Sequence, residues 1–121
     1  MRCKQGVDVN HLRPELFQLF PVVEQVFWAF SKVPIITSTH DGSHMKGSLH
    51  YSDMAFDLRV RHLGEQQARH SLFMCLKKEI ERIYPGLYDV LHEYVGSESE
   101  HIHIEASPFL VGYLEGAVKE V

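Results

Sequence analysis

Cysteine is scarce in this chain of 121 residues, which contains only Cys3 and Cys75. Two cysteines this far apart are too few for a metal site built from thiolates. Cys75 lies in a helical pattern beside the apolar Leu76, so we expect it to be buried in the core. Both thiols are expected to be reduced, as in a protein made in a cytoplasm.

The sequence also lacks long apolar runs and clusters of positive charge. Its most apolar stretch, residues 16–30, is interrupted by polar residues and a proline and is shorter than a bilayer span. The first six residues contain no apolar segment of the kind that a signal peptide requires. The formal net charge is −4, and Lys and Arg are dispersed along the chain. We therefore expect neither a membrane nor a nucleic-acid partner.

Hydrophobic periodicity predicts one α+β domain over residues 1–121, with a mostly antiparallel sheet and flanking helices. In the first predicted helix, Pro21 should produce a kink or a split. The expected helices cover residues 13–31, 64–84 and, as a short or frayed segment, 108–121; the expected strands cover residues 34–39, 54–60, 87–95 and 101–106.

Histidine, by contrast, is abundant, with nine residues in the chain. Because histidine is the commonest metal ligand near neutral pH, this excess favours a metal site. His101, His103 and Glu105 alternate along a predicted strand, so their side chains should share one face while Ile102 and Ile104 point into the core. A solvated outer face of the sheet would give the same alternation.

Asp57 makes a metal site the stronger interpretation. It lies between two apolar residues on another predicted strand and should face away from them. Together with the histidines of residues 101–103 and with His50, in the loop before that strand, it would form a His/His/Asp set. Catalytic zinc sites use three protein ligands and leave a position for water. A nearby carboxylate, Glu100 or Glu98, could then act as the general base.

The residues around Asp57 resemble a known motif. Ser48, His50, Asp53, Ala55 and Asp57 match S-x-H-x-x-G-x-A-x-D of the zinc D-alanyl-D-alanine carboxypeptidase/dipeptidase family, except that Asp53 stands in place of the glycine. This family includes phage endolysins that cut between L-alanine and D-glutamate, and it shares a fold with the hedgehog signalling domain. Residues 100–103 resemble its second motif, E-x-x-H.

The resemblance implies that zinc is bound by His50, Asp57 and His103, with Glu100 as the base and Ser48 as a hydrogen-bonding support. His101 would then lie behind a ligand or beside the substrate, or simply face solvent. The second motif also fits two residues earlier, over residues 98–101, with Glu98 as the base and His101 as the ligand.

Two departures from the family pattern are visible. The family glycine often marks an unusual backbone angle, which aspartate tolerates better than most residues, so the loop should tolerate Asp53. Many members also carry an arginine shortly before the first motif, and none occurs there in this chain. His40 or His44 could donate to the carbonyl oxygen instead, or both could be ordinary loop histidines, or His44 could support a metal ligand. Arg59 is expected to form a structural ion pair near Glu105 or another carboxylate.

The resemblance implies a monomeric zinc peptidase that acts on bacterial peptidoglycan peptides, similar to small phage endolysins. Such an enzyme would be cytoplasmic at synthesis and would be released to the periplasm or cell wall of a host. The alternatives are a D-alanyl-D-alanine carboxypeptidase or dipeptidase, and a non-catalytic zinc-binding interaction domain of the same fold.

Overall fold

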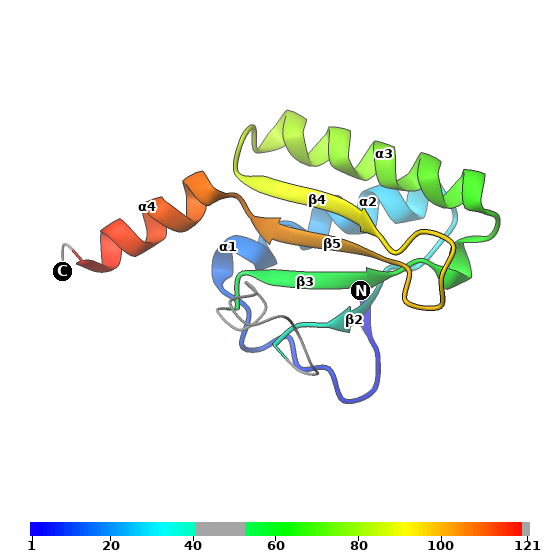
Figure 1. Cartoon of the computed structure of the whole chain (residues 1–121), viewed down its shortest axis with the longest axis horizontal. Helices are drawn as coiled ribbons and strands as arrows, with labels where there is room; N and C mark the ends of the chain where they lie inside the picture. Colours follow the sequence, from blue (N-terminus) through cyan, green and yellow to red (C-terminus); the bar gives the residue numbers. More distant parts are fainter. Residues whose placement is uncertain (41–52, 120–121) are drawn as a thin grey trace.

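A computed structural model describes residues 1–40 and 53–119 of the chain (Figure 1). The strands are β1 (Arg2–Cys3), β2 (Ile35–Ser38), β3 (Ala55–Arg59), β4 (Tyr88–Glu93) and β5 (His101–Ala106). The helices are α1 (Pro14–Phe17), α2 (Phe20–Ala29), the 3-10 helix η2 (Arg61–Leu63), α3 (Gln66–Ile83) and α4 (Pro108–Lys119). The predicted α+β class is therefore confirmed.

The five strands form one sheet in the order β1-β2-β3-β5-β4. β1 pairs in parallel with β2, whereas the other neighbouring strands are antiparallel. The sheet is thus mixed, which corrects the expectation of a mostly antiparallel sheet. The parallel strand escaped prediction because two residues, both exposed, are too short to show any periodicity.

One face of the sheet carries the hydrophobic core. Phe56 and Leu58 of β3 and Ile102 and Ile104 of β5 are fully buried. The helices α2 and α3 pack against each other, and α3 packs against β4 (Figure 1). The alternation of the strands sends the intervening residues to the opposite face, as the sequence predicts.

The predicted helix over residues 13–31 is split into α1 and α2. Pro21 occupies the first turn of α2, where its missing N–H loses no helical hydrogen bond. Cys75 is exposed, so the expectation of a core cysteine was wrong. The buried stripe of α3 contains Leu72 and Leu76, and Cys75 lies about 100° around the helix from Leu76.

The last helix, α4, extends away from the sheet (Figure 1). Leu110 and Leu114 are buried, which attaches the first half of this helix to the core. Among the described residues, no helix is both long and apolar enough to cross a membrane.

Candidate metal centre

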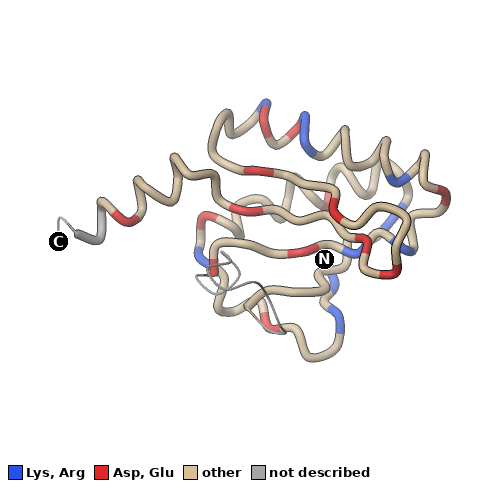
Figure 2. Tube along the Cα trace, viewed as in Figure 1, with Lys and Arg blue, Asp and Glu red and all other residues tan. Residues whose placement is uncertain are grey.

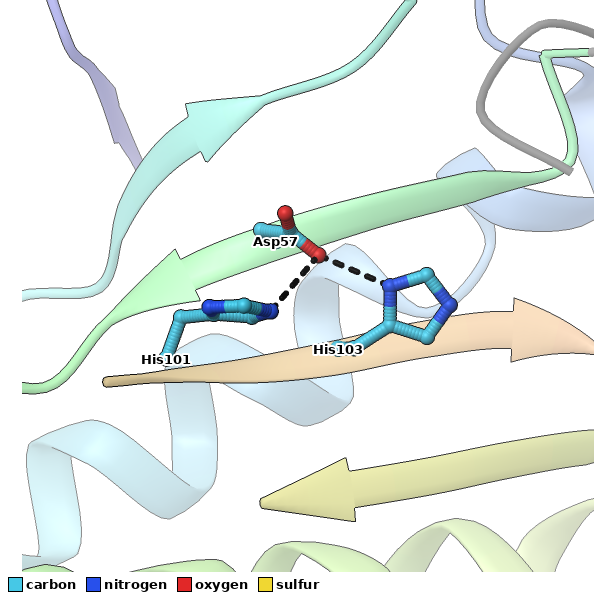
Figure 3. A group of neighbouring side chains, drawn as sticks. All are labelled: Asp57, His101 and His103. Atoms are coloured by element: carbon cyan, nitrogen blue, oxygen red, sulfur yellow. Dashed lines mark hydrogen bonds and ion pairs between the residues drawn. The ribbon is translucent and has the colours of Figure 1, made fainter. Parts of the chain in front are cut away.

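Three side chains from β3 and β5 meet on the face of the sheet opposite the core. Asp57 lies directly across from His103 in the antiparallel register, and His101 lies two residues before His103 (Figure 3). One ligand atom from each of the three residues lies within 4.8 Å of the others. Asp57 and His103 are buried, and His101 is partly buried. This group could hold a metal ion.

The Asp57 carboxylate is the centre of the group. Its Oδ1 atom lies 2.8 Å from Nδ1 of His103 and 3.8 Å from Nε2 of His101 (Figure 3). Burial alone would lower the pKa of His103. The hydrogen bond to Asp57 and the negative charges of Asp57, Glu105 and Glu93 outweigh burial and raise this pKa above its ordinary value. A proton on His103 would therefore compete with a metal ion.

In both histidines, the ring nitrogen that points away from Asp57 lies near an oxygen atom. Nδ1 of His101 lies 2.7 Å from the carbonyl oxygen of Ser99, which can only accept, so Nδ1 is the donor and Nε2 faces Asp57. Nε2 of His103 lies 3.7 Å from a carboxylate oxygen of Glu105. Metal-binding histidines usually donate their second N–H to a carbonyl or carboxylate, as His101 does to Ser99. The ring orientations therefore fit a metal ion between His101 Nε2 and His103 Nδ1.

Glu93 is a further member of this neighbourhood that sequence reasoning missed. Its Oε1 atom lies 3.0 Å from Nε2 of His101, and the two residues face each other across β4 and β5. The two predicted strands at residues 87–95 and 101–106 form a hairpin, and its register could have identified this pair. Counting back through the turn at residues 94–100 places Glu93 opposite His101.

A cleft of about 530 Å³ opens beside the metal group. Asp57 and His101 line it, so a ligand in the cleft would reach the group directly. Its other lining residues are Lys4, Thr37, Arg59, Arg61, His62, Glu98, Ser99 and Glu100.

The Glu100 carboxylate is occupied by other partners. It accepts hydrogen bonds from Arg69 Nε at 2.9 Å and from Gly96 N at 2.9 Å, and it lies 2.7 Å from His92 Nε2. Burial alone would raise the pKa of Glu100, but Gly96, His92 and Arg69 outweigh burial and lower it. The partners belong to α3, β4 and the turn after β4. The structure therefore brings this carboxylate to α3 and β4 rather than to Asp57.

The remaining predicted residues divide into two sets. Ser48, His50 and His44 lie outside the described residues. His40 is described, and its Nδ1 atom lies 3.4 Å from Oδ1 of Asp53, while its ring contacts the His11 ring at 4.4 Å. Among the described residues, its partners are therefore not those of the metal group.

Asp53 has the unusual backbone angle that its place in the motif predicts. Its φ is +61°, in the left-handed region that glycine adopts most easily. The backbone of Asp53 also ties the start of β3 to the chain before α1, because its carbonyl oxygen accepts a hydrogen bond from Arg13 N at 3.1 Å.

Comparisons with known proteins identified no relative of this chain: no family model matches it, and neither does any curated protein or solved structure.

Proposed function

We propose that this protein is a zinc-dependent peptidase that hydrolyses an amide bond in peptidoglycan peptides, similar to small phage endolysins. The observation that carries the proposal is the Asp57, His101 and His103 group beside an open cleft. The hedgehog-like peptidase fold is part of the same proposal. The motif resemblance and the φ of Asp53 support it.

The donor atoms favour zinc over calcium or magnesium. Two imidazole nitrogens and one carboxylate oxygen suit a transition metal such as zinc, whereas calcium and magnesium prefer oxygen ligands. Asp57 and His103 would supply two ligands. The third would come from His50, as the motif implies, or from His101, whose ring orientation is suitable. When bound, zinc would polarise the substrate carbonyl and acidify water.

We assign the general base to Glu98 rather than to Glu100. Both acids line the cleft with Asp57 and His101, but Glu98 is exposed and Glu100 is buried. Glu100 is held by three groups, and its lowered pKa makes it a weaker proton acceptor at neutral pH. This assignment uses the second register of the E-x-x-H motif, in which Glu98 accompanies His101. Glu100 then has a structural role at the β4–β5 turn.

The test compares the soluble products that metal-loaded variants release from purified peptidoglycan, identified by mass spectrometry. We expect wild type to release peptide fragments and His103→Ala to release none. Free D-alanine would identify a carboxypeptidase, and cleavage after L-alanine would identify an endolysin. The absence of products from metal-loaded wild type would overturn the enzyme proposal.

Two matched substitutions separate the roles of the two acids. We expect Glu98→Gln to lower kcat with little change in unfolding free energy, because the side chain is exposed. Glu100→Gln should destabilise the fold by about 2 kcal/mol, because it weakens a buried, charged hydrogen-bond network. Urea unfolding and kcat are measured on both variants, with exposed Glu115→Gln on α4 as the control. A Glu100→Gln protein that is fully stable but inactive would reverse the assignment.

A second candidate function is a non-catalytic zinc-binding domain. The observation that favours it is the lack of an arginine before the first motif. Stoichiometric zinc binding by wild type, without any product from peptidoglycan, would select this alternative.

A further inference from the structure

The cleft beside the metal group is lined by three cationic side chains as well as by carboxylates. Lys4 follows β1, Arg59 ends β3 and Arg61 begins η2, and all three line the cleft. Figure 2 shows basic positions near the N-terminus and at the end of β3. The three cations face a lining that also contains the carboxylates of Asp57, Glu98 and Glu100.

Arg59 is distinctive among these cations. Its side chain is partly buried, yet none of the residues in the described ranges 1–40 and 53–119 forms a hydrogen bond or ion pair with it. The expected pairing with Glu105 is prevented by the register, because Glu105 lies opposite Ala55 at the other end of β3. Arg61, in contrast, donates to the backbone oxygen of Glu98. A partly buried guanidinium is stabilised by an anionic partner.

The position of Arg59 relative to the metal group is fixed by the sheet. Arg59 lies two residues after Asp57 on β3, on the same face, and directly opposite His101 on β5. Two residues of a strand span about 7 Å. An extended peptide rises about 3.4 Å per residue, and the long Arg59 side chain can reach across the remaining distance. A substrate whose carbonyl lay at Asp57 and His103 could therefore place a neighbouring carboxylate at Arg59.

We propose that Arg59, with Lys4 in the same cleft, binds a carboxylate of the substrate one residue away from the bond that is cut. The inference rests on the proposed peptidase function. Guanidinium matches carboxylate because it presents paired N–H donors in a plane. In a peptidoglycan peptide this group would be either a C-terminal carboxylate or the free α-carboxylate of a γ-linked glutamate. Arg59 would then be the residue that selects the substrate.

The test uses two pairs of peptides, each a free acid and its carboxamide. The first pair is N-acetyl-D-alanyl-D-alanine, and the second is N-acetyl-L-alanyl-D-glutamate with its α-carboxylate free or amidated. Binding to zinc-loaded protein is measured by calorimetry, separately from hydrolysis. For one of the pairs we expect wild type to bind the acid about tenfold more tightly than the amide, as a charge-assisted hydrogen bond provides. The preferred pair identifies the source of the carboxylate.

Substitutions then assign that preference to Arg59. We expect Arg59→Gln to abolish the preference, Arg59→Lys to restore part of it, and the exposed Arg82→Gln on α3 to retain it. Equal affinity for acid and amide in both pairs, or no binding of either pair, would overturn the inference. If the protein prefers the acid over the amide but hydrolyses no peptide, the carboxylate site is supported and the peptidase proposal is contradicted.

Discussion

At the scale of single residues, the pH response of the metal group is set by the contact between His103 and Asp57. Nδ1 of His103 and Oδ1 of Asp57 are 2.8 Å apart, so a proton or a metal ion must lie between them for the contact to be favourable. Without a metal ion, the shared proton stabilises the fold. With a metal ion, the proton is displaced. The same contact therefore responds to pH in opposite directions in the two states.

This competition predicts how metal affinity changes with pH. The pKa of His103 is raised above 6.5 in the folded protein. We expect the apparent affinity for Zn²⁺ to fall about tenfold for each pH unit below that pKa, because one proton must leave His103. Competition titrations with a chromophoric chelator between about pH 5 and 8 measure it.

The metal-free protein should behave in the opposite sense. A raised His103 pKa contributes stability that is fully present below the unfolded pKa, near 6.5, and is lost as the pH rises through the folded pKa. Urea unfolding of the metal-free chain should show this loss, and the exposed His70→Asn variant should show it too. A His103→Asn variant should not. Zinc affinity that does not vary between about pH 5 and 7 would contradict the ligand role of His103.

At the scale of elements, the turns decide where the site residues lie. The turn between β4 and β5 pairs Glu93 with His101 and Leu91 with His103. Gly96 in this turn has a φ of +84° and donates its N–H to Glu100. This hydrogen bond anchors the turn and so fixes where β5 begins. The positions of His101 and His103 on β5 follow from that start.

The turn before β3 allows a direct test at Asp53. Because its φ is +61°, a β-branched side chain should be strained there. We expect Asp53→Val to destabilise the protein by about 1–2 kcal/mol and Asp53→Gly to stay within about 1 kcal/mol of wild type. Chemical unfolding measures both.

Asp53→Asn provides the matched control, because asparagine tolerates this backbone region. It should be as stable as wild type within about 0.5 kcal/mol, since the contact of Asp53 with His40 is partly exposed and contributes little. Equal stabilities for the valine and glycine variants would contradict the left-handed conformation.

At the scale of the whole molecule, the sheet separates stability from chemistry. The helices and the apolar side chains of β3 and β5 form the core on one face, and the metal group lies on the other. A substitution in the core should therefore change the free energy of unfolding without changing which atoms surround a metal ion.

Leu76 and Met74 on α3 test this separation. Leu76 is fully buried and Met74 is 49% exposed. We expect Leu76→Ala to lower the unfolding free energy by about 2–5 kcal/mol and Met74→Ala to change it by less than about 0.5 kcal/mol. Both variants, when folded, should bind zinc with the stoichiometry of wild type. Loss of zinc from a folded Leu76→Ala protein would show that the two faces are coupled.

Much of the local structure could be predicted because it depends on neighbours in the chain. The strand over residues 101–106 has its predicted bounds, and Asp57 faces away from Phe56 and Leu58 as predicted. The alternation of a strand and the φ demanded by a motif position are local properties. The sequence by itself thus determined which face His101, His103 and Asp57 occupy.

Only the tertiary structure decided which of these faces meet. The pairing of β3 with β5 places Asp57 beside His103, and the hairpin brings Glu93 to His101. From the sequence, Glu100 was expected to be the base and Arg59 to pair near Glu105 or another carboxylate. In the structure, Glu100 packs against Arg69 of α3, and the register of β3 places Glu105 opposite Ala55 instead of Arg59. Strand order and side-chain pairing depend on contacts between distant parts of the chain, which alternation along one strand does not encode.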